Sequence, residues 1–165
     1  MAKLRLFANL REAGFLRCDL TAAEFQNVSG YDLCFERCQL GGVNLSGSDF
    51  RLPIGETVDL TAFTMRHCNF AYGDLSNTYL RGCELTDNRM IEMQLHNTVL
   101  TEAVFRGSDL SNVTGSGISL KGADLRDATF NNLDARVIDL EGVKINLEQV
   151  LVLLEPLGVI VDDPP

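Results

Sequence analysis

The sequence predicts an all-β fold in which the chain coils as a four-sided parallel solenoid, followed by a short C-terminal helix and strand. Three observations support this: a large apolar residue recurs at every fifth position, a small residue stands two positions before it, and residues twenty apart tend to be alike. A spacing of five fits neither the two-residue alternation of a strand nor the 3.6-residue turn of a helix. It indicates a repeat in which five residues form one side of a coil.

The large apolar position recurs over nearly the whole chain. Every fifth residue from Leu10 to Ile145 gives 28 positions, of which 24 are Leu, Phe, Met or Ile. Because the phase is never lost, we expect these side chains to form one continuous core. The exceptions are Gly30, Gly55, Gly115 and Ala135.

The small position carries a second regularity. Two residues before each large residue, 20 of the 28 residues are Ala, Cys, Ser, Thr, Val or Gly, and Asp or Asn stands between the two 11 times, as in Ala123-Asp124-Leu125. Short carboxylates bond nearby main-chain N–H groups in Asx turns. We therefore expect these aspartates to shape the corners of the coil.

Residues twenty apart predict how the coils stack. A uniform period of 20 gives about seven coils and, at ~4.8 Å per β-layer, a rod roughly 34 Å long. One predicted column is Leu20, Leu40, Leu60, Leu80, Leu100, Leu120 and Leu140, and another is Phe25, Leu45, Met65, Leu85, Phe105, Leu125 and Ile145.

The stretch Arg51–Val58 departs from the pattern, with Pro53 at a small position and Gly55 at a large one. Proline cannot donate to a strand ladder, and glycine leaves the core short of a side chain. Two interpretations stand: one side of the coil is locally collapsed, or a loop projects and contacts a partner. Because the frame resumes unshifted, such a loop holds a multiple of five residues or lies within the existing turns. Its candidate contact residues are Arg51, Pro53 and Glu56.

The period changes after Ile145. Asn146 is the predicted N-cap of a helix, with Gln149 completing a capping box, and Pro156 ends the helix near Glu155. Residues 157–161 are predicted to form a short strand. We therefore divide the chain into a β-helix over residues 1–145 and a C-terminal cap over residues 146–165.

The predicted helix covers the open end of the coil, where an unpaired edge would invite aggregation. It carries more apolar side chains than one end of a coil can bury. We therefore expect a symmetric homodimer formed through the C-terminus. The predicted contact residues are Leu147, Val150, Leu151, Leu154, Leu157 and Val159.

No catalytic, cofactor or metal site is predicted, and we expect a protein without enzymatic activity. His67 and His96 stand at outward positions without companion ligands, and no nucleophile elbow, phosphate-binding loop or dinucleotide motif occurs. The chain shows no predicted membrane span or leader, so a cytoplasmic location is expected. Four cysteines fall on the small-residue lattice and should behave as buried apolar side chains: Cys18, Cys38, Cys68 and Cys83.

The net charge of −9 implies repulsion from nucleic acid and from anionic membranes, and favours a partner with a basic surface. Solubility is the plainer explanation of the same excess. With a uniform period of 20, the most negative side is the one that carries the leucine column. Its acidic residues are Asp19, Asp59, Glu102, Asp139 and Glu141.

The pattern in Ala123–Asp127 resembles that of the pentapeptide-repeat proteins, whose fold is a right-handed quadrilateral β-helix, and the resemblance covers about residues 8–147. The segments CELTDNRM (83–90) and IDLEGVKINLEQVLVLLEPLGVIV (138–161) are similar to segments of the Qnr quinolone-resistance proteins. That resemblance implies a dimeric, DNA-mimicking rod that binds DNA gyrase and topoisomerase IV and protects them from quinolones.

One departure from the Qnr pattern bears on the expected activity. Longer Qnr chains interrupt the register with projecting loops that matter for protection, whereas this chain keeps phase throughout. The resemblance thus supports topoisomerase binding more firmly than quinolone protection, and inhibition of gyrase is an alternative outcome. A generic β-helical scaffold or immunity protein for another partner is the competing hypothesis, and a metal or redox role for the cysteines ranks last.

Overall fold

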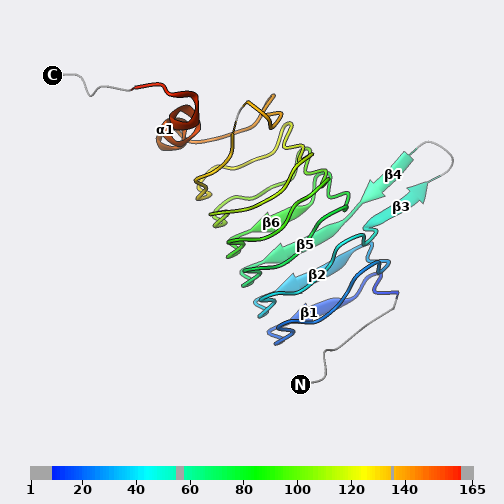
Figure 1. Cartoon of the computed structure of the whole chain (residues 1–165). Coiled ribbons are helices and arrows are strands. Elements are labelled where there is room, and N and C mark those ends of the chain that lie inside the picture. The colour runs from blue at the N-terminus through cyan, green and yellow to red at the C-terminus, as the bar shows by residue number, and fades with distance from the viewer. Residues whose placement is uncertain (1–8, 55–57, 135, 161–165) are drawn as a thin grey trace.

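The computed structural model describes residues 9–54, 58–134 and 136–160, and its chain winds into a β-helix with a hairpin on its side and a helix at its C-terminal end (Figure 1). Strands β1 (Gly14–Leu16), β2 (Leu33–Glu36), β5 (Phe63–Arg66) and β6 (Glu84–Thr86) form a parallel sheet in that order. Strands β3 (Arg51–Ile54) and β4 (Val58–Thr61) form the antiparallel hairpin. Helix α1 (Leu147–Leu154) is followed by the 3-10 helix η1 (Glu155–Leu157).

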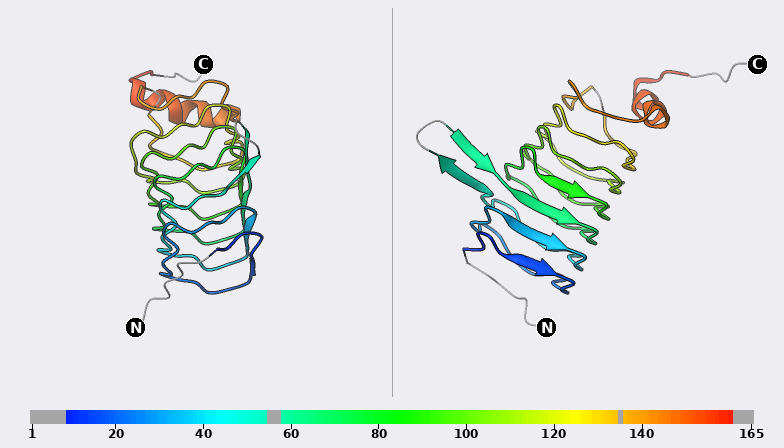
Figure 2. Two further views of the ribbon diagram at one scale, coloured as in Figure 1. Left: turned by 90° about the vertical axis from the view of Figure 1, so that its right-hand side faces the viewer. Right: turned by 180° about the vertical axis from the view of Figure 1, so that it is seen from behind.

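The coil has four sides, which Figure 2 shows from two further directions. Face B is the four-stranded parallel sheet, and the other sides are held by single parallel bridges between successive turns. Face A has Asn9, Ser29, Asp49, Tyr79, Val99, Ser119 and Asp139 at its middle positions. Face C has Asp19, Gln39, Asn69, Arg89, Asp109 and Thr129, and face D has Glu24, Asn44, Asp74, Gln94 and Thr114.

The corners are made by left-handed residues that recur at intervals of five. Arg17 and Tyr72 have φ of 55° and 60°, in a region that costs a non-glycine residue roughly 1–2 kcal/mol. The same residues donate to the next turn: Arg17 N–H lies 2.9 Å from the Glu36 carbonyl oxygen. These ladder bonds offset the cost of the corner.

The predicted Asx turns are confirmed. Asp74 Oδ1 accepts the Ser76 N–H at 2.8 Å, and Asp109 Oδ1 accepts the Ser111 N–H at 3.0 Å. Each aspartate thus bonds the main chain two residues onward, where the coil turns its corner. The same contact is made by Asp19, Asp49, Asp124, Asp134 and Asp139.

The predicted lattice of inward side chains forms the core. Phe25, Phe35, Leu45 and Phe50 are fully buried. The N-terminal part of the core is aromatic, with the Phe15 and Phe35 rings stacked at 5.1 Å between centroids, an arrangement that adds to the burial of their area. Gly30 stands at a large position because a Cβ there would lie 3.0 Å from the Phe50 ring.

The uniform period of 20 is wrong at one place, and both predicted columns fail there. Leu33 pairs with Phe63 and Gln39 with Asn69, an offset of 30 residues. Leu40 therefore stacks beneath Phe70, and Met65 stacks on Phe35 rather than on Leu45. Leu80, Leu100, Leu120 and Leu140 instead belong to face A, the side of the coil that carries Phe50.

The ten extra residues form the hairpin. A projecting segment whose length is a multiple of five is therefore confirmed, and the interpretation of a collapsed side is wrong. The lattice keeps its phase across the hairpin because ten is two whole repeats. Gly55 and Ala135, two of the expected lattice exceptions, lie outside the described residues.

The C-terminal helix is confirmed and the C-terminal strand is not. Asn146 N–H donates to Gln149 Oε1 at 2.7 Å, as in a capping box, and α1 ends at Leu154, just before Glu155. Residues 155–157 form η1, and Gly158 has φ of 72°. The expected strand over 157–161 is wrong in its described part, because this left-handed glycine turns the chain and no strand edge lies beside it.

Replacing Gly73 by alanine should destabilise the β-helix, because the new Cβ would lie 2.4 Å from two atoms of the fully buried Phe70 ring. We expect a loss of about 1–3 kcal/mol in the free energy of unfolding. Gly41→Ala is the matched control, since its Cβ would meet only the Ala71 carbonyl oxygen at 3.9 Å and should change stability by less than about 0.5 kcal/mol. Chemical denaturation of both variants measures this, and equal stabilities would contradict it.

Candidate functional site

The hairpin projects from the corner between faces A and B (Figure 1). The Ala62 N–H donates to the Phe50 carbonyl oxygen at 3.2 Å and closes its base. Ile54 and Leu60 are 49% and 45% exposed, so the hairpin presents apolar surface to solvent. Pro53 lies opposite Asp59 in a two-stranded ribbon, where both strands are edges and proline is tolerated.

Arg51 ties the hairpin to the coil. Its Nε lies 2.8 Å from Asp49 Oδ1 on its own turn, and its Nη1 lies 3.5 Å from Asp59 Oδ2 on β4. Its guanidinium carbon lies 5.8 Å from the centroid of the Tyr79 ring on the following turn. The hydrogen bond from Arg51 lowers the pKa of Asp49 below its usual range.

A cavity of about 370 Å³ lies on face A beside the base of the hairpin. Its lining is mostly polar and neutral, apart from the ion pair between Asp49 and Arg51. The hairpin therefore combines an apolar tip with a polar recess at its root. The lining residues are Gly47, Ser48, Asp49, Arg51, Asn77, Thr78, Tyr79, Asn97 and Val99.

The predicted loop residues lie where a partner could reach them. Arg51 and Pro53 belong to β3, and Glu56 lies outside the described residues. Of the predicted acidic face, Asp59 lies on β4 and is therefore a hairpin residue.

The predicted acidic residues do not share one face, because the ten-residue hairpin moves the later turns by half a coil. Asp19 lies on face C, whereas Asp139 lies on face A, with Glu102 and Glu141 at the adjoining corner. Glu102 pairs with Arg81 at 3.1 Å, and Glu141 pairs with Lys121 at 2.5 Å. Part of the negative charge on this side is therefore offset.

Faces C and D together carry a more continuous acidic surface. Asp19 and Asp109 lie on face C, Glu24 and Asp74 lie on face D, and Glu92 lies at the corner between them. Asp74 and Asp109 accept hydrogen bonds from main-chain N–H groups, which leaves their negative charge in place. The corrected stacking offset was the one piece of information needed to find this surface from the sequence.

The C-terminal end carries an exposed apolar patch. Its most exposed members are Leu147, at 83%, and Ile160, at 86%, while Val152 and Leu153 pack inward against the core. Of the predicted dimer residues, Leu147, Leu151, Leu157 and Val159 are exposed, and Val150 and Leu154 are half-buried. Ile160 was not among the predicted residues, because the expected strand gave it no outward side.

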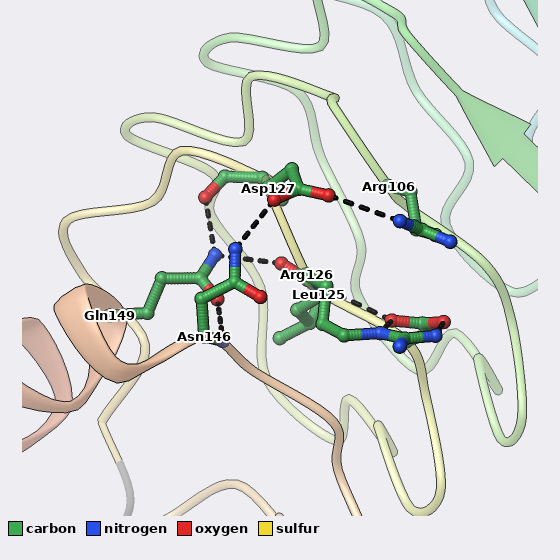
Figure 3. A network of polar contacts seen from close by, with 8 residues as sticks. Arg106, Leu125, Arg126, Asp127, Asn146 and Gln149 are labelled. Atoms are coloured by element: carbon green, nitrogen blue, oxygen red, sulfur yellow. Dashed lines mark hydrogen bonds and ion pairs between the residues drawn. The ribbon is translucent and has the colours of Figure 1, made fainter.

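A polar network anchors α1 to the end of the coil (Figure 3). Gln149 Nε2 donates to the carbonyl oxygens of Leu125 and Ala128 at 2.7 and 2.6 Å. Asn146 donates through Nδ2 to Asp127 Oδ1, and Arg106 bonds the other oxygen of Asp127 at 3.3 Å. The helix thus bonds carbonyl groups that a further turn would otherwise have met.

The cysteines are free thiols, and Cys38, Cys68 and Cys83 are buried. Burial raises the pKa of Cys68 to about 11 and that of Cys83 to about 12, so these two stay protonated. Within the described ranges, no group of three His, Cys, Asp or Glu side chains is placed to hold a metal ion. In that same part of the chain, no helix has the length and apolar character needed to cross a membrane.

Comparison with known proteins identifies the family. The Pentapeptide repeats model matches eight copies over residues 64–101 and 105–145. QnrB4 from Escherichia coli is 33% identical over 88 residues, which are 53% of this chain and 41% of that protein. A trypsin-treated variant of QnrB1, a plasmid-mediated fluoroquinolone resistance protein, superimposes with a TM-score of 0.85 at 30% identity, covering 94% of this chain and 73% of that one. This chain is a Qnr-type pentapeptide-repeat protein.

The likeness extends to a pentapeptide-repeat protein from Vibrio parahaemolyticus, VPA0095, which is 31% identical over 86% of this chain. The β-helix of this Qnr-type protein is right-handed. The chain spans less than half the length of QnrB4, so what QnrB4 does as a whole protein does not transfer directly.

Replacing Arg51 by glutamine should raise the pKa of Asp49 toward its ordinary value, because the charged donor that lowers it is removed. A folded-state pKa below the unfolded value adds stability above the unfolded pKa, near 4, and this stability is lost as the pH falls through the folded pKa. Arg51→Gln should therefore weaken the acid sensitivity that Asp49 contributes.

Titration of the carboxyl groups by NMR measures this shift. Arg136→Gln is the matched control: it should raise the pKa of Asp134 from about 2 and leave Asp49 unchanged. An Asp49 pKa that does not move in Arg51→Gln would contradict the assignment.

Proposed function

We propose that this protein binds a type II topoisomerase, DNA gyrase or topoisomerase IV, and changes its response to quinolones without catalysing a reaction itself. The observation that carries the proposal is the superposition on QnrB1, a fluoroquinolone resistance protein, over 94% of this chain. A relative at 32% identity is also described as a quinolone resistance pentapeptide-repeat protein.

The charge supports a basic protein surface as the partner, rather than DNA or an anionic membrane. Residues 8–147 carry 19 acidic and 12 basic residues, a net −7. Over a rod of roughly 34 Å that is about one net charge per 5 Å, against one per ~1.7 Å in duplex DNA. Charge alone therefore imitates DNA only in part, and shape and specific contacts must supply the rest.

The acidic surface and the hairpin divide these tasks. Faces C and D would meet the basic DNA-binding surface of the enzyme and speed the encounter. The hairpin offers Ile54 and Leu60, whose exposed apolar area would be buried in a specific contact. A projecting hairpin also removes the departure from the Qnr pattern that argued against quinolone protection.

The exposed C-terminal patch supports a homodimer within the same proposal. Leu147, Leu151, Leu157, Val159 and Ile160 form an apolar surface at one end of the rod. A two-fold axis through this end would bury the patch against itself. The product would be a rod about twice as long, with a hairpin on each half.

Deleting residues 51–60 should abolish the effect on gyrase while keeping the fold. The deletion joins Phe50 to Thr61 and removes two whole repeats, so every turn would then stack at an offset of 20 residues. Supercoiling and cleavage by purified gyrase, with and without ciprofloxacin, measure the effect, and circular dichroism checks the fold. We expect the full-length protein to act in a salt-sensitive manner. No effect of the full-length protein at tens of micromolar would reject the proposed function.

Replacing Leu151 by glutamate should convert the dimer to a monomer, because a charge would be buried in the apolar contact. The matched control is Val137→Glu, since Val137 is 79% exposed and lies outside the C-terminal patch. Sedimentation equilibrium should give a dimer for the unaltered protein and for Val137→Glu. An 18.2 kDa species for the unaltered protein would show that the patch has another purpose.

A further inference from the structure

The main-chain ladder of face A has a gap at the root of the hairpin. Successive turns on this face are joined by the bridges Asn9↔Ser29, Ser29↔Asp49, Tyr79↔Val99, Val99↔Ser119 and Ser119↔Asp139. Asp49 and Tyr79 face each other in this series, and no bridge joins them. The gap coincides with the place where the chain leaves the coil to form β3.

The gap leaves two donors and two acceptors open. Elsewhere on this face Asp49 N–H donates to the Val28 carbonyl and Gly30 N–H donates to the Asp49 carbonyl. The equivalent bonds here would run from Tyr79 N–H to the Ser48 carbonyl and from Phe50 N–H to the Tyr79 carbonyl, and neither is formed among the described residues. Leaving such groups unpaired away from water is costly.

The cavity of about 370 Å³ lies over this gap and gives access to it. Its mouth is framed by Asn77 and Asn97, whose carboxamides bond each other at 3.2 Å, and by the side chains of Tyr79 and Val99. One end stays closed, because Gly47 N–H still donates to the Ser76 carbonyl at 2.9 Å. The opening is therefore too short for a whole strand and suits a single polar side chain.

This protein uses carboxamide groups where its own ladder fails. Face D has a second break, after Thr114, where Asp134 forms no bridge. There the Asn131 carboxamide oxygen accepts the Asn112 N–H at 2.9 Å, and Asn132 donates through Nδ2 to the Val113 carbonyl. The two asparagines replace the missing main-chain bonds.

Two further carboxamides act in the same way. Gln149 donates to the Leu125 and Ala128 carbonyls at the end of the coil. Asn88, buried between turns, accepts the Cys68 N–H at 2.8 Å and donates to the Met65 carbonyl at 2.7 Å. Only a carboxamide combines an acceptor oxygen and two donor hydrogens in one small neutral group.

We propose that the gap between Asp49 and Tyr79 receives the side-chain carboxamide of an asparagine or glutamine from a protein partner that lies along face A against the hairpin. The carboxamide oxygen accepts from Tyr79 N–H or Phe50 N–H, and its NH₂ donates to the Ser48 or Tyr79 carbonyl. A carboxylate has no donor and is repelled by Asp49, and an ammonium group has no acceptor. The slot thus selects a neutral amide within the partner's contact surface.

Acetamide is the probe, used with the full chain and followed by amide NMR. In the free protein, Tyr79 N–H should exchange with solvent about tenfold or more faster than the bonded amides of Asp49 and Val99. Acetamide should shift the Tyr79 and Phe50 resonances saturably and slow their exchange, whereas acetate should do neither. Equal protection of Tyr79 and Val99 in the free protein would show a closed ladder and overturn the proposal.

Two matched variants separate the slot from general solvent effects. Val99→Trp fills the mouth of the cavity and should abolish the response to acetamide. Val104→Trp places the same side chain at the equivalent half-buried position on face B and should leave it intact. Equal responses in both variants, or equal shifts with acetate, would overturn the proposal. These outcomes do not involve gyrase, so they stand or fall separately from the proposed function.

Discussion

The main-chain hydrogen bond between successive turns is the interaction on which this molecule depends. It joins residues about twenty apart along the coil, and it compensates for corners that hold residues as unlike as Arg17 and Tyr72 in the left-handed region. Because the bond uses no side chain, the outward positions are free to vary, while the inward ones must fill a narrow core. The result is a rod whose shape is set by the backbone and whose surface is open to selection for binding.

Features that depend on neighbouring residues could be predicted from the sequence. The five-residue lattice, the Asx turns and the helix start at Asn146 are of this kind, because a few adjacent positions determine each of them. The pairing of turns could not be predicted in the same way. A ten-residue hairpin leaves the lattice in phase, so nothing in the periodicity distinguishes Leu60 from a core residue. The acidic face was misassigned for that reason, since Asp19 and Glu102 share a side only if the offset is 20 throughout. The strand expected after Pro156 failed for a related reason: a strand needs an edge to pair with, and local composition does not supply one.

The places where the ladder is interrupted are also the places with binding potential. At the end of the coil, α1 covers part of the opening through Gln149 and leaves an apolar patch outside. At the root of the hairpin, the interruption leaves polar main-chain groups and a cavity. The regular faces between them carry charge in a repeating arrangement, which favours encounter over specificity. Affinity and selectivity would then be set by the irregular sites and the rate of approach by the regular ones.

The length of the hairpin has a consequence for how such proteins diversify. A segment of two whole repeats can enter or leave at a corner without altering the contacts of any turn above or below it. Insertions of five, ten or fifteen residues would be accepted in the same manner, whereas one of seven would turn every later inward side chain toward solvent. The fold thus behaves as a rack with fixed slots, into which recognition segments of permitted lengths can be exchanged while the supporting frame is left untouched.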